Sequence, residues 1–289
     1  MNMNLKAKTI AITGATGGLG KQIALEAARC GANLIFVNRS QNKSDSLEKE
    51  IKASFPLTKI TTVIADLESP QSVNAALDKL LKFEIDYLIL NAGIYNVPIK
   101  MLKCGYNNIF VVNFVSQYYI VRKLLENGSQ IKKVIAIGSI AHAHKKFDET
   151  DIDYSGRRSQ TKIYGNSKKF LMYSMETLKQ LFPNTEFSIA HPGITHTSMT
   201  SHYPKAINWL VKFGVKVLFA PPQKACRSVF MALENESKSM EWFGPRFCDI
   251  YGKPTKKRLK HNANEVSKIM NAINVIYKNI NKQLKNDPL

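Results

Sequence analysis

A glycine-dense turn between a strand-like run and a helical pattern constrains this chain more than any other feature. Residues 9–13 are β-formers, and segment 13–20 has the sequence Thr-Gly-Ala-Thr-Gly-Gly-Leu-Gly. An apolar helical periodicity begins at Leu19, and Gly31 is placed to end the helix. Backbone without side chains lets a pyrophosphate approach closely, while a helix N-terminus directs unpaired N–H groups and a positive dipole end at it. The segment therefore predicts a dinucleotide site.

The rest of the chain alternates between strand-like and helical patterns. Strand-like segments lie at 9–13, 33–38, 59–65, 85–91, 133–139 and 187–191, and helical ones near 18–30, 42–55, 69–82, 101–126 and 160–181. This alternation predicts an α/β fold, a doubly wound parallel sheet (Rossmann fold) with helices on both faces. The 289 residues contain no internal repeat or low-complexity linker, so we expect a single domain at 1–252 and a C-terminal helical extension at 253–289.

Ligands of such a sheet bind beyond the carboxyl ends of the strands. Asn38, Arg39 and Ser40 follow the second strand-like segment, where NAD enzymes usually place an acid for the adenine ribose. The planar fork of donors on Arg39 suits a phosphate instead. The sequence therefore favours NADP(H) over NAD(H), with a surface arginine at a strand end as the alternative.

A serine, a tyrosine and a lysine form the candidate catalytic set. Ser139 ends the fifth strand-like segment, and Tyr164 and Lys168 are four residues apart on a predicted helix, so they share one face. An unperturbed phenol, with a pKa near 10, exchanges protons poorly at neutral pH, but a neighbouring ammonium lowers that pKa. The pair therefore suits general acid–base catalysis.

These segments together resemble the short-chain dehydrogenase/reductase superfamily over about residues 5–235. The resemblance rests on Thr-Gly-x-x-x-Gly-x-Gly at 13–20, Asn-Ala-Gly at 91–93, Ser139, Tyr-x-x-x-Lys at 164–168 and Pro-Gly at 192–193. It implies that Ser139 binds the substrate carbonyl, that Tyr164 passes the proton and that Lys168 holds the nicotinamide ribose. It also implies that Asn113 supports a proton-relay water.

The resemblance further implies the cofactor contacts. Asp66 would contact the adenine ring, the backbone of Ile194 the nicotinamide carboxamide, and Thr197 the cofactor phosphates. The expected cofactor-binding residues are Thr13, Gly14, Thr16, Gly18, Leu19, Gly20, Asn38, Arg39, Ser40, Asp66, Leu67, Asn91, Ala92, Gly93, Tyr164, Lys168, Pro192, Gly193, Ile194 and Thr197.

Three features resemble the retinol-dehydrogenase-like branch of the superfamily. They are a long polar stretch between Ser139 and Tyr164, the run at 66–73, and Trp-Phe-Gly-Pro at 242–245 with Tyr-Gly-Lys-Pro at 251–254. That branch acts mostly with NADP(H) on apolar aldehydes, ketones and alcohols. The first strand-like segment begins within eight residues of Met1, so we expect neither a signal peptide nor the N-terminal membrane anchor of many animal members.

Residues 194–220 are the expected substrate lid, since this stretch is apolar enough to cover a hydrophobic substrate. The alternatives are a packing helix, an oligomer contact, or, less favoured, a membrane-surface helix with Lys212 and Lys216 at its rim. The four cysteines are dispersed without a C-x-x-C pair, which favours a reduced, cytoplasmic setting. The histidines, such as the pair His142 and His144, lack a third ligand at metal spacing, so no metal site is expected.

The net charge of +19 is the one unusual property of the composition. Part of it is local, because the chain from Lys253 onward carries nine Lys or Arg and two acidic residues. No nucleic-acid motif accompanies these residues, so a solvated basic face is favoured over a nucleic-acid or acidic-surface site. An apolar stripe from Val266 to Leu284 predicts a helix that packs on its own core or on a second subunit.

The sequence thus predicts an NADP(H)-dependent oxidoreductase that transfers a hydride between nicotinamide and the carbonyl or alcohol carbon of an apolar small molecule. Tyr164 is the expected general acid and base. A non-catalytic NADP(H)-binding sensor or interaction module with the same fold is the alternative, because a fold does not fix a function.

Overall fold

The computed structural model describes residues 3–143, 146–157, 159–193 and 222–286. The expected lid at 194–220, with Ile194 and Thr197, lies outside these ranges. In the described part of the chain, eight strands form one sheet in the order β3-β2-β1-β4-β5-β6-β7-β8. The strands are β1 (Thr9–Thr13), β2 (Asn33–Asn38), β3 (Ile60–Ile64), β4 (Tyr87–Leu90), β5 (Lys133–Ile137), β6 (Glu186–Ala190), β7 (Glu241–Phe247) and β8 (Tyr251–Arg258).

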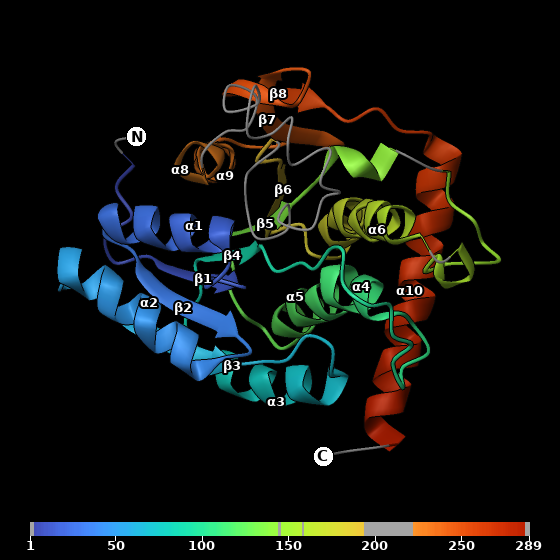
Figure 1. Cartoon of the computed structure of the whole chain (residues 1–289), viewed down its shortest axis with the longest axis horizontal. Helices are drawn as coiled ribbons and strands as arrows, with labels where there is room; N and C mark the ends of the chain where they lie inside the picture. Colours follow the sequence, from blue (N-terminus) through green and yellow to red (C-terminus); the bar gives the residue numbers. More distant parts are fainter. Residues whose placement is uncertain (1–2, 144–145, 158, 194–221, 287–289) are drawn as a thin grey trace.

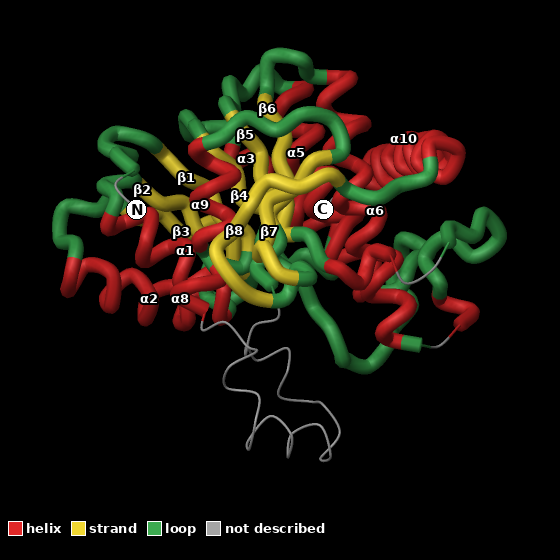
Figure 2. The backbone as a smooth tube through the Cα atoms, turned by 90° about the horizontal axis from the view of Figure 1, so that it is seen from above, coloured by secondary structure: helices red, strands yellow, loops and turns green. Residues whose placement is uncertain are grey.

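Neighbouring strands from β3 to β7 are parallel, and only β8 is antiparallel to its neighbour. The order turns back at β1, whose neighbours are β2 and β4, so helices cover both faces (Figures 1 and 2). The predicted doubly wound α/β fold is therefore confirmed. The helices are α1 (Gly18–Arg29), α2 (Gln41–Ser54), α3 (Pro70–Leu80), α4 (Asn108–Phe110), α5 (Ser116–Glu126), α6 (Gln160–Leu181), α8 (Pro222–Ala225), α9 (Arg227–Glu234) and α10 (Ala263–Asn286).

The two faces of the sheet have separate apolar cores. Alternate residues of β1 point to opposite faces, so Ala11 packs with α3, α5, α6 and α10, while Ile10 and Ile12 pack with α1, α2 and α9. Because both faces are covered, Ile10, Ala11 and Ile12 of β1 form an uninterrupted apolar run rather than an alternating pattern. These two cores hold the strands in place, and the carboxyl ends of the parallel strands lie at the same edge of the sheet.

The domain boundary predicted between residues 252 and 253 is wrong, because it falls inside β8. The basic run from Lys253 to Arg258 is a sheet strand paired with β7, not the start of a tail. The sequence gives a weak strand signal for β7 and β8, because Gly244 and Pro245 lie within β7 and Pro254 lies within β8. Glycine and proline both have low β-propensity. The β7–β8 hairpin therefore belongs to the domain.

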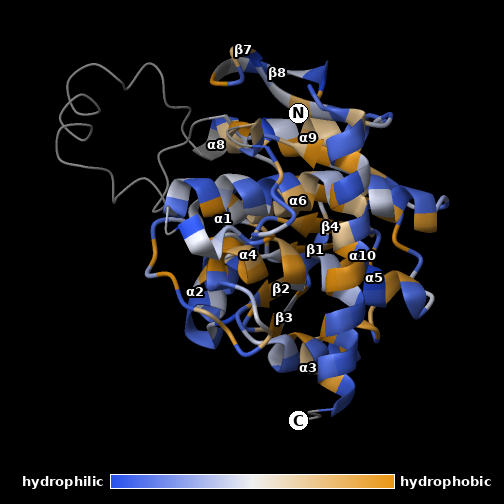
Figure 3. Ribbon diagram, turned by 90° about the vertical axis from the view of Figure 1, so that its right-hand side faces the viewer, coloured by the Kyte–Doolittle hydropathy of each residue, from blue (hydrophilic) through white to orange (hydrophobic). Residues whose placement is uncertain are grey.

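Helix α10 packs its apolar stripe on the chain's own core. Of the two alternatives from the sequence, the chain's own core or a second subunit, the structure therefore shows the first. The buried stripe consists of Val266, Ile269, Ile273, Ile276, Tyr277 and Ile280. It joins the core formed with α3, α5 and α6, and Figure 3 shows the alternation of apolar and polar residues along α10. Among the described residues, no helix combines the length and hydropathy needed to cross a membrane.

Candidate active site

A cavity of about 490 Å³ lies at the carboxyl ends of the central strands. It brings together residues that the sequence analysis drew from seven separate segments. The predicted residues that line it are Gly14, Thr16, Gly18, Leu19, Gly20, Asn38, Arg39, Asp66, Leu67, Asn91, Ala92, Gly93, Ser139, Tyr164, Lys168, Pro192 and Gly193. Of the remaining predicted residues, Thr13, Ser40 and Asn113 lie outside the lining, and Ile194 and Thr197 are not described.

The glycine turn is shaped to receive an anion. Gly14 has a φ of +65°, and Gly20 packs so tightly that a Cβ atom would lie 2.3 Å from the carbonyl oxygen of Gly14. Helix α1 begins immediately after Gly17, which provides no side-chain cap. The N–H groups of its first turn are therefore not satisfied by a side chain and face the cavity, as a phosphate site requires.

Thr13 lies behind the cavity wall and joins the two turns that form it. Its buried Oγ1 accepts hydrogen bonds from the backbone N–H groups of Asn91 and Ala92, both at 3.0 Å, and donates to Oε1 of Gln117 at 2.9 Å. The Asn91 amide in turn donates to the carbonyl oxygens of Thr13 and Gly14, both at 3.0 Å. Thr13 thus positions the site rather than lining it.

The end of the cavity beside β2 and β3 carries the residues expected to bind the adenine ribose. Arg39 is exposed and makes no hydrogen bond or ion pair with another described residue, so its guanidinium is available at the cavity edge. Asn38 is buried and donates to Ser44 Oγ at 2.9 Å, while its Oδ1 has no partner among the described residues. Ser40 instead caps α2, since its hydroxyl accepts from the Lys43 N–H at 3.4 Å.

Tyr164 and Lys168 lie one turn apart on α6, and both line the cavity with Ser139. The Lys168 ammonium lies 5.9 Å from the centre of the Tyr164 ring and donates to the carbonyl oxygen of Ile137 at 2.9 Å. Burial lowers the pKa of Lys168 to about 8. Ser139 Oγ accepts from the Ala141 N–H at 3.2 Å, which leaves its hydroxyl proton to donate.

Asn113 is fully buried in a π-helical turn, Val111–Val115, between α4 and α5. Its Oδ1 accepts from the Ile94 N–H at 2.7 Å, and its Nδ2 donates to the Ile94 carbonyl at 3.1 Å and to Ser167 Oγ at 3.0 Å. Asn113 therefore connects the chain after the Asn-Ala-Gly turn to α6. Such π-turns occur often at functional sites, and the proton-relay role of Asn113 stays a prediction.

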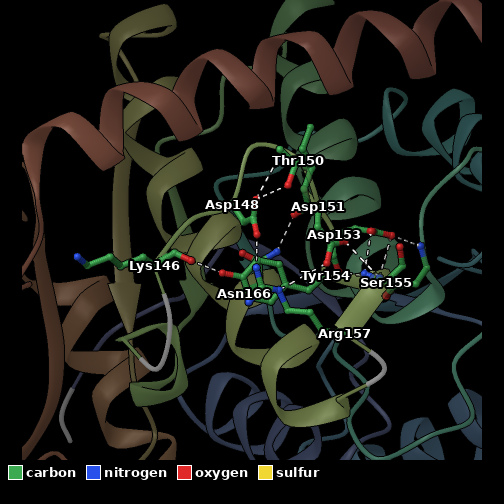
Figure 4. A network of polar contacts seen from close by, with 12 residues as sticks. Lys146, Asp148, Thr150, Asp151, Asp153, Tyr154, Ser155, Arg157 and Asn166 are labelled. Atoms are coloured by element: carbon green, nitrogen blue, oxygen red, sulfur yellow. Dashed lines mark hydrogen bonds and ion pairs between the residues drawn. The ribbon is translucent and has the colours of Figure 1, made fainter.

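The polar stretch between Ser139 and Tyr164 is held by a network of charged and polar side chains (Figure 4). Arg157 pairs with Asp148 and Asp151, and Asp153 accepts from the backbone and side-chain amides of Asn107. Asn166 on α6 donates to the Ile152 carbonyl at 2.7 Å. The network attaches this stretch to the start of α4 and to α6, the helix that carries the candidate catalytic residues Tyr164 and Lys168.

Sequence reasoning missed several residues of the site. Tyr95 lines the cavity with its ring centre 5.0 Å from that of Tyr164, and its hydroxyl lies 3.1 Å from Thr161 Oγ1. Gln117 was also missed, although it is fully buried and its Oε1 accepts a hydrogen bond from the Thr13 hydroxyl. Tyr95 lies two residues after the Asn-Ala-Gly turn, so its place after a strand end was an available signal, whereas a single helical glutamine offered none.

The doubly wound sheet and the glycine turn at the start of α1 are those of dinucleotide-binding α/β proteins. The chain belongs to the short chain dehydrogenase family, whose sequence profile matches residues 8–208. Among characterised relatives, mouse retinol dehydrogenase 12 is 30% identical over 206 residues, and human retinol dehydrogenase 13 is 29% identical over 205. These matches cover 69% and 68% of this chain but only 65% and 62% of the two relatives.

Other matches extend over more of the chain. The chloroplastic short-chain dehydrogenase TIC 32 A of Brassica napus is 25% identical over 86% of this chain and 82% of its own length. Among solved structures, a putative uncharacterized protein from Mycobacterium paratuberculosis has a TM-score of 0.75 at 22% identity and covers 97% of this chain and 95% of its own. L-sorbose reductase from Gluconobacter frateurii, complexed with NADPH and L-sorbose, has a TM-score of 0.62 at 21% identity over 80% of this chain and 92% of its own. These structures share the fold.

Proposed function

We propose that this protein is an NADP(H)-dependent reductase or dehydrogenase of uncharged, apolar carbonyl and alcohol compounds. One observation carries the proposal: Ser139, Tyr164 and Lys168 line the same cavity as the glycine turn at the start of α1. A protein that only senses a nucleotide has no use for this acid–base set, so the arrangement favours turnover over sensing.

The described residues fit a dinucleotide. The uncapped N-terminus of α1 and Gly14, with its positive φ, suit the pyrophosphate, and the unpaired Oδ1 of Asn38 suits a hydroxyl of the adenine ribose. The free guanidinium of Arg39 supports a preference for the 2′-phosphate of NADP(H). Lys168 would hold the nicotinamide ribose from the buried side of the cavity.

When bound, NADPH supplies the hydride that reduces a carbonyl carbon. Tyr164 donates its phenolic proton to the carbonyl oxygen, and Ser139 donates a hydrogen bond to the same oxygen and fixes its direction. The Lys168 ammonium favours the phenolate that remains. In the oxidative direction, Tyr164 accepts the proton of the alcohol instead.

The lining beside Tyr164 favours an apolar, uncharged substrate. Its described residues include Ile94, Ile140 and Ala141, together with the ring of Tyr95. His191 also lines this part of the cavity, and burial lowers its pKa to about 4, so it is neutral near pH 7. Apart from Lys168, the described residues at this end offer no cation to pair with a carboxylate or phosphate on the substrate.

The test is the consumption of NADPH over a panel of short-chain and long-chain aldehydes, ketones and quinones, with NADH in parallel. We expect turnover of apolar carbonyls with NADPH and a much lower kcat/KM with NADH. Equal or better use of NADH would contradict the role of Arg39. Absence of turnover with every compound, despite NADPH binding, would favour the sensor.

We also propose a cytoplasmic location, because the four cysteines are dispersed along the chain without a C-x-x-C pair and three of them are buried. Cell fractionation tests this location, and recovery of the protein in the membrane fraction would contradict it.

A further inference from the structure

The Trp-Phe-Gly-Pro segment of β7 lies against the turn that follows β6. The His191 N–H donates to the carbonyl oxygen of Phe243 at 2.7 Å, and the His191 ring stacks on Trp242 with centres 5.1 Å apart and planes at 16°. A Cβ atom on Gly193 would lie 2.9 Å from Cγ of Pro245. Successive residues of β7 thus contact successive residues of the His-Pro-Gly turn at 191–193.

The His191 side chain reaches from this turn to two other segments. It is 3% exposed, and burial keeps it neutral near pH 7, so only one ring nitrogen carries a proton. Nε2 lies 2.9 Å from the carbonyl oxygen of Asp249, which makes Nε2 the donor. Nδ1 then carries no proton, so its 3.4 Å approach to the carbonyl oxygen of Gly138 is a contact without a hydrogen bond. The Asp249 carboxylate forms an ion pair with Lys257 on β8 at 2.7 Å. This ion pair holds Asp249, whose carbonyl accepts from His191, in the turn between β7 and β8.

A second histidine contacts both Trp242 and the catalytic serine. His142 Nδ1 lies 2.7 Å from the carbonyl oxygen of Ser139, and because a carbonyl only accepts, Nδ1 must carry the proton. The His142 ring, which is 6% exposed, meets Trp242 edge to face with centres 5.7 Å apart. Trp242 therefore touches two imidazoles that contact the carbonyl groups of Gly138 and Ser139.

We propose that Trp242, His142 and His191 form a positioning unit for the Gly138–Ser139 turn. His142 donates to the Ser139 carbonyl, and the stacked rings of Trp242 and His191 hold His142 in place, so that the Ser139 hydroxyl stays directed at the substrate oxygen beside Tyr164. The inference rests on the proposed function, and it gives the Trp-Phe-Gly-Pro motif a role in the reaction. The unit acts through Ser139, so its loss lowers kcat while NADPH binding at the glycine turn is retained. Loss of comparable supporting contacts in other sites costs about 10- to 100-fold, and we expect a fall in kcat in this range.

The test compares His142→Leu, which removes the side-chain donor to the Ser139 carbonyl and keeps the backbone N–H donor at 3.2 Å, with His142→Asn, whose amide nitrogen restores a side-chain donor at a similar position. Ile273→Ala is the matched control, because Ile273 is fully buried in α10 and is not among the described residues that line the cavity. Each full-length variant is assayed for kcat, KM for NADPH, and amide hydrogen exchange of residues 138–143 by mass spectrometry.

We expect His142→Leu to lose at least tenfold in kcat with an unchanged KM for NADPH, and to exchange amides 138–143 at least tenfold faster. His142→Asn should recover both properties to within about threefold, and Ile273→Ala should change neither. Wild-type exchange of 138–143 in folded His142→Leu would overturn the inference, whatever the activity. If exchange responds as expected but wild-type protein reduces no carbonyl, the proposed function fails while the positioning unit stands.

Discussion

Replacing Thr13 with valine tests whether the glycine turn and the Asn-Ala-Gly turn form one unit. The two side chains have nearly the same shape, so Thr13→Val creates no cavity and removes only the hydroxyl. That hydroxyl accepts from the N–H groups of Asn91 and Ala92 and donates to Oε1 of Gln117, and the Thr13 residue is fully buried. The Asn91 N–H keeps the Ile89 carbonyl as a second acceptor at 3.1 Å, so two partners lose their hydrogen bond. Each partner left unsatisfied costs about 1–3 kcal/mol, so we expect a loss of about 2–6 kcal/mol in the free energy of unfolding.

The assay is urea unfolding, where a constant slope shows that the change is one of stability, and the midpoint should fall by about 1–2 M. Thr62→Val is the matched control, because Thr62 lies on β3 and its buried Oγ1 has no hydrogen-bond partner among the described residues. Valine there should change stability by less than about 0.5 kcal/mol or raise it. If Thr13→Val shifts the midpoint no more than Thr62→Val, the hydroxyl does not join the two turns.

Three further predictions follow from single residues. Arg39→Ala should weaken NADPH binding about 10- to 100-fold, since one charge-assisted contact to phosphate is lost, and leave NADH binding unchanged in fluorescence titrations. The kcat/KM for NADPH should be flat below pH 8 and fall above it, because Lys168, with its pKa lowered to about 8, loses its charge there; Lys168→Arg should abolish that break. Gly20→Ala places a Cβ atom 2.3 Å from the Gly14 carbonyl and should lower Tm, unlike Gly17→Ala, whose Cβ atom would lie at an ordinary 3.4 Å.

The central part of the fold was predictable because each element has a strong local signal. Alternation of β-branched runs with helical periodicity gave β1 to β6 to within about two residues, and Ser69 with Pro70 marks the start of α3. The helix predicted at 101–126 begins only at Asn108, because the segment before it folds as a loop with Gly105 at a φ of +86°. The apolar residues of segment 101–107 resemble a helical pattern by composition without forming one.

The candidate site was predictable where its residues follow strand ends, since the doubly wound topology brings those ends together. Long-range partnerships gave no sequence signal. Nothing local distinguishes Gln117 from any other helical glutamine. The cap of α2 by Ser40 is a local contact instead, and a serine directly before a helix is a signal that could have predicted it. The place of Trp242 beside His142 and His191 depends on β7 joining the sheet next to β6, and strands broken by glycine and proline hide that pairing.

In the proposed reaction, the phenol of Tyr164 moves the proton while the glycine turn holds the nucleotide. Tyr164→Phe keeps the ring that packs on Tyr95 and removes only the hydroxyl. Measured side by side for NADPH affinity and for turnover of the best aldehyde, this variant should bind NADPH like the wild type and lose at least about 100-fold in kcat. Turnover equal to that of the wild type would contradict the account.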